Sequence, residues 1–311
     1  MNTAHVSGKT FLCVCLNPVI QKTLVFGRLE RGEVNRTAMY RTDMAGKGLI
    51  PTRVLGQLGE KAIHLTQLGG PSRDWFLSMA ADEGLSIEWV ESGAPIRVCT
   101  TVIEREAGAA TELVEEALPV AAGTSALVAE RFAMLLPRVD VVMLSGTVAA
   151  GIEPGTMGLL AGLAAAAGKR LYLDVKGRDL LDCLVHRPVC AKPNLEELAL
   201  TRGVPYASVR RDDDARRLVA EAGCEFWERY GCRLVVTRGS MSTMYWDGQR
   251  PGELAVPVVD AINPIGSGDS FGVGLACMLE RGSTLAEAVA EGNRLGALNA
   301  TRLKPGSILP D

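Results

Sequence analysis

The sequence has few aromatic residues, few histidines and no excess of positive charge. Phe, Trp and Tyr make up 5% of its 311 residues, and the formal net charge is −3. Proteins that bind nucleic acids usually carry a basic surface and often stack bases on aromatic side chains. These shortages therefore argue against a nucleic-acid partner.

The chain also lacks the motifs of common metal sites and of membrane segments. Its eight cysteines form no CxxC pair, its three histidines form no HExxH motif, and no apolar run approaches the length of a membrane span. The N-terminal residues are polar and contain no apolar signal core. We therefore expect a cytoplasmic protein with reduced, buried thiols, without a zinc site and without a membrane partner.

Three nucleotide-binding motifs are missing as well. The chain has no GxxxxGK[ST], no GxGxxG that opens a helix after the first predicted strand, and no HRD or DFG signature. The first absence excludes a P-loop kinase, the second weakens the case for a dinucleotide-binding domain, and the third excludes a protein kinase.

Apolar stretches of strand length alternate with longer stretches of helical periodicity. This alternation predicts βαβ units and a mostly parallel sheet with helices on both faces. Strands are predicted at 11–16, 62–67, 98–104, 139–144, 170–174, 189–191, 234–237 and 254–259. Helices are predicted at 49–57, 74–83, 125–136, 156–167, 195–202, 212–230, 271–279 and 285–301.

Two further stretches of alternating character, 22–26 and 35–42, flank a turn near Arg31-Gly32 and predict an exposed β-hairpin or flap. Polar, Gly-rich or Pro-rich loops follow several predicted strands. In parallel sheets, ligands bind beyond the carboxyl ends of the strands, so these loops predict one substrate cleft. The loops are Asn17-Pro18, Ser145-Gly146, Asp174, Lys192-Pro193-Asn194 and Thr237-Arg238-Gly239.

The most informative segment is Gly266-Ser267-Gly268-Asp269, which precedes an apolar stretch typical of a buried helix. Glycines at this place let the backbone aim its N–H groups at one point, and a helix N-terminus favours an anion. A phosphoryl group in transit fits such a cradle, with Asp269 as the base for an attacking hydroxyl. Alternatively, Asp269 is an ordinary helix N-cap, and the segment alone does not decide between the two.

A series of short motifs runs in order along nearly the whole chain. They are Leu16-Asn17-Pro18-Val19-Ile20, Gly32-Glu33-Val34-Asn35-Arg36, Gly46-Lys47-Gly48, Leu144-Ser145-Gly146, Lys192-Pro193-Asn194-Leu195-Glu196-Glu197, Thr237-Arg238-Gly239, Asn263 to Asp269, and Pro305-Gly306-Ser307-Ile308-Leu309-Pro310-Asp311. Together they resemble the ribokinase/PfkB family of carbohydrate kinases, in the branch of 1-phosphofructokinase and tagatose-6-phosphate kinase. Each motif is short, but the ordered set is specific.

The resemblance implies a single ribokinase-like α/β/α domain over 1–311, with a β-flap lid formed by about 21–45 and 96–116. It implies ATP-dependent phosphoryl transfer to a hydroxyl of a sugar or sugar phosphate, of the fructose 1-phosphate or tagatose 6-phosphate type. It assigns Asp269 as the catalytic base. The implied anion hole consists of Gly266, Ser267 and Gly268.

The resemblance also implies residues that bind ATP, Mg²⁺ and the acceptor. The nucleotide-site matches are Lys192, Asn194, Thr237, Gly239 and Asn293. The substrate-site matches are Asn17, Gln21, Arg36, Gly46, Lys47, Arg97 and Ser145. Lys47, Arg36 and Arg97 are the candidates to hold a substrate phosphate, although each alone is more often a surface charge. Glu197 would hold Mg²⁺ through water, or else be a solvated carboxylate in the first turn of a helix.

The chain departs from the family pattern mainly on the sugar side. Gln21 stands where the family has a sugar-contacting aspartate, Ala45 where it has a glycine, and Ile50 where it has an asparagine. Lost hydrogen-bonding groups typically cost about 1–3 kcal/mol each when the ligand group stays unpaired. On the nucleotide side, Ser242 replaces a later glycine. Pro264 replaces a threonine or similar residue and would alter a nearby monovalent-cation loop.

Three functions stay open at this point. The first is a kinase acting on a sugar phosphate, and the second is a family kinase with a shifted acceptor, such as another sugar or a nucleoside. The third is a catalytically weak, regulatory sugar- or nucleotide-binding protein, against which the intact Asp269 and its glycines argue. Family members often form homodimers through the flap, and the apolar face of 24–26 would suit such a contact, although an ordinary lid would look the same.

Overall fold

A computed structural model of the chain describes residues 8–309. Its main sheet contains nine strands among these residues, in the order β13-β12-β11-β10-β9-β8-β1-β4-β5. These strands are β1 (Thr10–Val14), β4 (Lys61–Leu68), β5 (Ser86–Glu91), β8 (Val141–Ser145), β9 (Arg170–Asp174), β10 (Cys190–Ala191), β11 (Arg233–Thr237), β12 (Ser242–Trp246) and β13 (Pro251–Ala255). Neighbours from β11 to β5 are parallel, and β12 and β13 are antiparallel.

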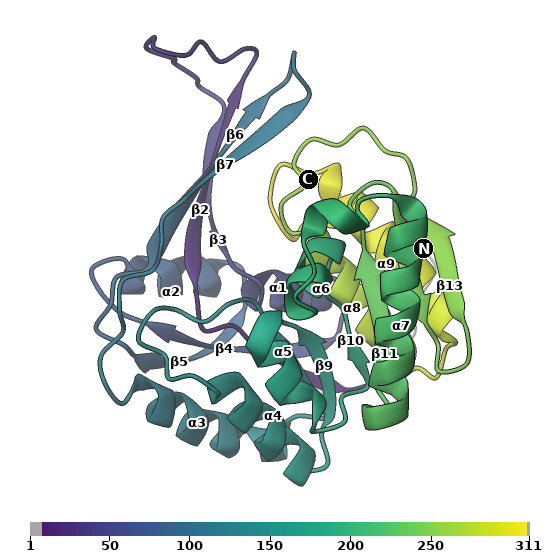
Figure 1. Cartoon of the computed structure of the whole chain (residues 1–311). Helices are drawn as coiled ribbons and strands as arrows, with labels where there is room; N and C mark the ends of the chain where they lie inside the picture. The colour runs from purple at the N-terminus through teal and green to yellow at the C-terminus, as the bar shows by residue number, and fades with distance from the viewer. Residues whose placement is uncertain (1–7, 310–311) are drawn as a thin grey trace.

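Helices cover both faces of this sheet (Figure 1). They are α1 (Leu49–Gln57), α2 (Arg73–Asp82), α3 (Thr124–Leu135), α4 (Thr156–Ala166), α5 (Gly177–Leu184), α6 (Leu195–Thr201), α7 (Asp212–Tyr230), α8 (Ser267–Glu280) and α9 (Leu285–Ala300), with short 3-10 helices at Leu136–Arg138 and Tyr206–Val209. The predicted three-layer α/β fold with a mostly parallel sheet is confirmed.

Two apolar cores lie on the two faces of the sheet. On β1, Leu12 and Val14 pack in the core shared with α3 to α7, whereas Phe11 and Cys13 pack in the core shared with α1, α8 and α9. All four side chains are fully buried. A parallel strand covered on both faces is apolar throughout, which explains why β1 could be recognised as a continuous apolar run.

A second sheet projects from the body (Figure 1). It has the order β3-β2-β6-β7 and consists of β2 (Val19–Phe26), β3 (Tyr40–Ala45), β6 (Arg97–Glu104) and β7 (Ala109–Val114). We call this sheet the flap. A third apolar cluster, which includes Ile20, Met44 and Phe76, packs its base against α2 and the start of α1. Burial decreases outward, and the residues of β7 are exposed throughout.

The structure corrects several element boundaries. The strand predicted at 35–42 begins at Tyr40, because the Asn35 side chain bonds the backbone of Glu30 on both its N–H (2.9 Å) and its carbonyl (2.8 Å). The strand predicted at 254–259 is β13, which ends at Ala255 two residues before Pro257. Elements β5, β7, β12 and α5 were not predicted as separate elements.

Other predictions agree closely with the structure. Helices α1 and α7 begin and end where their periodicity indicated. All eight cysteines are free, and all but Cys224 are buried. Within residues 8–309, no helix is both long and apolar enough to cross a membrane. The last two residues of the C-terminal motif, Pro310-Asp311, lie outside the described residues.

The glycines of α1 give a matched pair for testing this packing. A Cβ on Gly48 would lie 2.5 Å from His64 Cε1 and 2.8 Å from Cys15 Cβ, whereas a Cβ on Gly56 would meet nothing within 4 Å. We expect Gly48→Ala to lower the free energy of unfolding by about 1–3 kcal/mol through overpacking. Gly56→Ala should instead raise it by up to about 1 kcal/mol, because alanine is the better helix former. Urea unfolding of both variants checks this, and equal effects would contradict it.

Candidate active site

A cavity of about 380 Å³ lies between the carboxyl ends of the parallel strands and the flap. We call it the cleft. From the body it is lined mainly by polar and glycine residues, namely Gly46, Lys47, Asp174, Lys192, Asn194, Glu197, Thr237, Gly266, Gly268 and Asp269. From the flap it is lined by Val19, Gln21, Ala45, Arg97, Cys99, Glu112 and Val114. Most of the residues singled out in the sequence thus meet at one place, as expected of a parallel sheet.

A smaller cavity of about 150 Å³ adjoins the cleft. We call it the side pocket. It shares Gly46, Lys47, Arg97, Asp174 and Glu197 with the cleft and adds Cys15, Asn17, Gly146, Thr147, Val175 and Lys176. Asn17 Nδ2 donates to Thr147 Oγ1 at 3.2 Å, whereas Asn17 Oδ1 is buried without a partner among the described residues. The Nε of Arg97 is likewise buried and without a partner there.

The N-terminus of α8 opens onto the cleft. Its N-cap, Gly266, has φ +84°, a backbone conformation that suits glycine. The first N–H groups of a helix have no partners within the helix, and the helix dipole adds positive potential there. Lys192 Nζ lies 3.9 Å from the point that a Cβ on Gly268 would occupy. Backbone donors and a cation therefore converge, as a site for a phosphoryl group requires.

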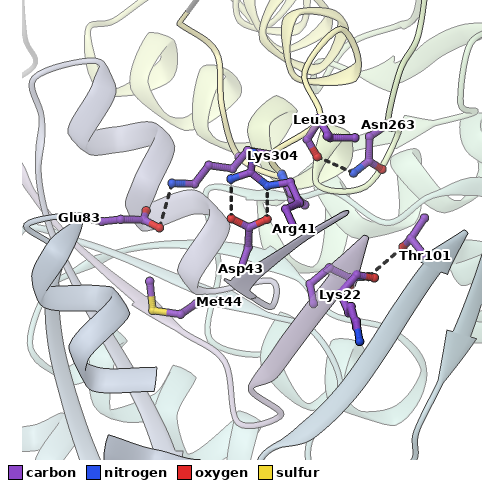
Figure 2. A network of polar contacts seen from close by, with 12 residues as sticks. Lys22, Arg41, Asp43, Met44, Glu83, Thr101, Asn263, Leu303 and Lys304 are labelled. Carbon is purple, nitrogen blue, oxygen red and sulfur yellow. Dashed lines mark hydrogen bonds and ion pairs between the residues drawn. The ribbon is translucent and has the colours of Figure 1, made fainter. Parts of the chain in front are cut away.

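Two buried asparagines hold the loop before α8. Asn263 Nδ2 donates to the Leu303 carbonyl at 2.9 Å (Figure 2), and Asn263 Oδ1 accepts from the Ile265 N–H. Asn299 Nδ2 donates to the Ile265 carbonyl at 2.8 Å and to Ser267 Oγ at 3.1 Å. The shape of the anion loop therefore depends on Asn299, in α9, which sequence reasoning missed. In the sequence, Asn299 stands out only as an amide among the apolar residues of a predicted helix.

The segment that follows α9 is fastened to α1 and α2. Arg53 Nη1 donates to the Pro305 carbonyl at 2.7 Å, and Gln57 Nε2 donates to the Gly306 carbonyl at 2.6 Å. Lys304 pairs with Glu83 at 2.9 Å (Figure 2). The Gly306 N–H in turn donates to Asn299 Oδ1 at 2.6 Å. Residues 303–309 thus connect the anion loop to the opposite side of the cleft.

Lysines and carboxylates alternate along the wall of the cleft. Asp174 accepts from Lys47 at 3.3 Å and pairs with Lys192 at 3.2 Å, and Glu197 accepts from Lys47 at 3.2 Å. Burial opposes ionisation of Asp174, but the two lysines outweigh it and hold its pKa below the ordinary value. Burial also opposes the charge of Lys47, yet Asp174 and Glu197 hold the lysine pKa above its ordinary value.

Asp269 differs from these paired carboxylates. It is 8% exposed and has no hydrogen-bond or ion-pair partner within residues 8–309. Burial raises its pKa to about 6, although Lys47 works in the opposite direction. The N-cap is Gly266 and Asp269 makes no capping hydrogen bond, so the N-cap interpretation is wrong. A buried, unpaired carboxylate facing the cleft has the properties of a general base.

Asn194 and Glu197 form a capping box at the start of α6. Asn194 Oδ1 accepts from the Glu197 N–H at 2.8 Å, and Glu197 Oε2 accepts from the Asn194 N–H at 2.9 Å. The other carboxylate oxygen of Glu197 contacts Lys47, and its side chain is 13% exposed. Glu197 is therefore not a freely solvated carboxylate, the alternative considered above.

Six predicted site residues do not line the cleft. Asn17 lines the side pocket only, and Ser267, Arg36, Asn293, Ser145 and Gly239 line neither cavity. Arg36 is exposed in the loop at the outer end of the flap and lines a separate depression there. Within a single chain it therefore cannot hold a substrate phosphate together with Lys47 and Arg97. Asn293 is 4% exposed, and its amide links Thr243 (2.7 Å) to the Ala255 carbonyl (3.2 Å). Ser145 is buried at the end of β8, and Gly239 lies in an exposed turn. Short motifs located these residues but could not show which way they face.

Sequence reasoning also overlooked some residues that line the two cavities. Asp174 was noted as a strand end but not as the partner of two lysines, and Glu112, Thr147 and Lys176 were not considered. Thr147 had a recognisable signal, because it directly follows the loop after β8. Glu112 had none, since β7 is an exposed edge strand whose pairing depends on distant residues.

The raised pKa of Asp269 predicts an effect on stability. The folded chain binds this proton more tightly than an unfolded chain does, so ionisation of Asp269 destabilises the fold. The destabilisation is complete above about pH 6 and absent at pH values far below the ordinary pKa of 3.8. Asp269→Asn should therefore raise the free energy of unfolding by up to about 3 kcal/mol at about pH 8. The gain should largely vanish at about pH 4. Denaturant unfolding at the two pH values tests this, and a gain independent of pH would refute it.

Comparisons with known proteins identify the family and the fold. A model of the pfkB family carbohydrate kinases matches residues 14–311. Phosphofructokinase-2 from Escherichia coli in complex with potassium superposes with a TM-score of 0.81 at 20% identity, covering 95% of this chain and 93% of that one. A Thermotoga maritima protein described as a possible 1-phosphofructokinase gives 0.83 at 19% identity, with coverages of 95% and 93%. The two structures show the shared fold, and the family match extends over nearly the whole sequence: the chain belongs to the pfkB family of carbohydrate kinases.

Proposed function

We propose that this carbohydrate kinase transfers the γ-phosphoryl group of ATP to a hydroxyl of a sugar phosphate, of the fructose 1-phosphate or tagatose 6-phosphate type. The observation that carries the proposal is the position of Asp269. This buried, unpaired carboxylate lies in the first turn of α8, whose N-terminus opens onto the same cleft. A base and an anion site next to each other are what phosphoryl transfer to a hydroxyl needs.

Asp269 acts as the base in this proposal. The acceptor oxygen forms a bond to the γ-phosphorus as the bond from that phosphorus to the ADP oxygen breaks, and the hydroxyl proton moves to the carboxylate of Asp269. A pKa of about 6 leaves the carboxylate ionised at neutral pH and makes it a stronger base than an ordinary aspartate. The lysines nearby stabilise charge without taking the proton.

The N-terminus of α8 stabilises the phosphoryl group in transit. The N–H groups of Gly266, Ser267 and Gly268 and the ammonium group of Lys192 provide the donors and the positive charge. Asn299 and Asn263 keep the loop in shape before substrate arrives, so little reorganisation is needed during transfer.

The nucleotide lies on the side of Thr237 and Asn194, which both line the cleft and form a β-bridge with each other. Gly239 continues this loop, whereas Asn293 supports it from behind through Thr243. Within residues 8–309 there is no cluster of three or more His, Cys, Asp or Glu that could hold a metal ion. This fits Mg²⁺, which keeps several waters, is held largely by phosphates, and neutralises their charge. Glu197 would hold it through water.

The side pocket suits the phosphate of the acceptor. Arg97 supplies a guanidinium group there, with an Nε that lacks a partner among the described residues, and Thr147 and Lys176 add further donors. Lys47 is a weaker candidate, because Asp174 and Glu197 already neutralise it. One related structure is that of Escherichia coli phosphofructokinase-2 in complex with fructose-6-phosphate, at 20% identity.

Two further features belong to the same proposal. The flap serves as a lid that excludes water from the cleft, and exposed apolar side chains on it, including Val34 (75% exposed), Tyr40 (64%) and Leu113 (58%), suit contact with a second copy in a homodimer. A monovalent cation would bind near the loop of Pro264, which adjoins residues 303–306. Support comes from the related phosphofructokinase-2, whose structure is in complex with potassium.

Replacing the base should abolish turnover while sparing nucleotide binding. We expect Asp269→Asn to lower kcat by a factor of about 10² or more, with little change in the affinity for ATP. In the wild type, kcat/KM for the acceptor should fall as the pH drops below about 6, because protonated Asp269 cannot act as a base. Asp260→Asn, at an exposed aspartate, is the control. Coupled ADP-release assays over pH measure both effects, and unchanged turnover in Asp269→Asn would remove Asp269 from the mechanism.

Removing the charge of Arg97 should affect the phosphorylated acceptor selectively. Arg97→Gln should raise KM for a sugar phosphate about tenfold or more, because a charge-assisted hydrogen bond is lost. KM for ATP should stay the same, and the effect on an unphosphorylated sugar should be small. Arg105→Gln, at an exposed arginine beside the outer end of the flap, is the matched control. Equal losses for phosphorylated and free sugars would show that Arg97 does not bind the phosphate.

A further inference from the structure

One part of the cleft lining is apolar, and we call it the floor. It consists of four almost fully buried residues from the flap strands and the start of α1. These are Val19 (5% exposed), Ala45 (2%), Ile50 (2%) and Cys99 (5%). A buried thiol behaves as a small apolar group.

Ile50 is the floor residue that lies nearest to the anion loop. Its Cδ1 is 3.1 Å from the point that a Cβ on Gly266 would occupy. Its Cγ2 is equally close to the corresponding point at Gly306. Ile50 therefore packs against the N-cap of α8 while it lines the same cavity as Asp269.

Gln21 is the polar residue beside the floor. Its Nε2 donates to Thr101 Oγ1 at 2.8 Å, and Gln21 is 2% exposed. A sugar hydroxyl directed at the side chains of Ile50, Ala45 or Cys99 would leave water without gaining a hydrogen bond from them. A binding site rejects such an unpaired polar group by a large factor, whereas a hydrogen atom at the same position costs nothing.

Glu112 adds a carboxylate, which accepts hydrogen bonds, to the flap side of the cleft. The strand register pairs Cys99 with Val114 and Thr101 with Glu112, so Val114 and Glu112 lie on the face of the flap that lines the cleft and Leu113 lies on the other face. Partial desolvation of its carboxylate raises the pKa of Glu112 although the residue is exposed, and Arg97 partly offsets this. Glu112 has no hydrogen-bond or ion-pair partner among the residues that the structure describes.

Asp43, another carboxylate on the same face of the flap, already has a partner within the protein. The register places Asp43 opposite Gln21, and Arg41 holds it through contacts of 2.5 and 2.8 Å (Figure 2). Its hydrogen-bonding capacity is therefore largely used within the protein. Glu112 is the flap carboxylate that is left to accept a hydrogen bond from a ligand.

We propose that the natural acceptor is a deoxygenated sugar phosphate, which rests a hydroxyl-free carbon on the floor at Ile50 and donates another of its hydroxyls to Glu112. The inference rests on the proposed kinase function and narrows its substrate class. Ile50 and Glu112 are specificity-determining residues in this view, whereas Asp269 and the anion loop carry out the transfer.

The first test uses matched acceptors. Fructose 1-phosphate and tagatose 6-phosphate are compared with monodeoxy analogues that keep the phosphate and the attacking hydroxyl. We expect the wild type to show kcat/KM at least about tenfold higher for one deoxy analogue than for its parent. Ile50→Asn should reverse this preference, and the apolar control Ile50→Val should keep it. If Ile50→Asn does not fold, the comparison of acceptors in the wild type still tests the inference.

The second test removes the flap carboxylate. Glu112→Ala should raise KM for the preferred acceptor about tenfold and leave KM for ATP and the melting temperature unchanged. Glu116→Ala, at an exposed glutamate just beyond β7, is the matched control and should change neither constant. The loss caused by Glu112→Ala should disappear with the deoxy analogue that lacks the hydroxyl facing Glu112.

The outcomes separate this inference from the function on which it rests. If the fully hydroxylated parents are better acceptors than every deoxy analogue, the apolar-floor inference is overturned and the kinase proposal stands. If Glu112→Ala changes KM for no acceptor, the role of Glu112 is overturned in the same way. If no sugar phosphate of either kind is phosphorylated while ATP still binds, the proposed function fails and this inference fails with it.

Discussion

The cleft depends on the ion pairs that join Lys47, Asp174, Lys192 and Glu197. Burying a charge is costly unless it is paired, and here each lysine contacts a carboxylate at 3.2–3.3 Å. Asp174 ends β9 and Lys192 directly follows β10, so the parallel order of the sheet brings them together. The pairing keeps the lysines charged and in place beside α8. It also leaves Asp269 as the cleft carboxylate of the body without a partner, so the same interaction that stabilises the wall isolates the base.

The sequence predicted the layers of the fold and that the loop of 266–269 lies at the cleft, but not which residues face each other. Local periodicity located α1 and α7 because their apolar stripes are formed by neighbouring residues. The ion pairs of Asp174 and the position of Glu112 were not predicted, because they come from strand pairing over long distances in the chain. Arg36 and Asn293 were assigned to the site by motif alone, and motifs do not record side-chain direction.

The cleft divides into two halves of different character. The body contributes charge, backbone donors and Asp269, all attached to the ends of strands and helices around the main sheet. The flap and the start of α1 contribute Gln21, Ile50 and Glu112. If the proposed roles hold, such a division lets the acceptor change while the residues of phosphoryl transfer stay the same.

The fastening of residues 303–309 makes the anion loop sensitive to a helix on another part of the chain. Leu303 and Gly306 hold Asn263 and Asn299, which in turn shape the anion loop. The same segment is held from its other side by Arg53 and Gln57 of α1. A substitution in α1 that shifts this segment would therefore distort the anion loop without touching any residue of the cleft.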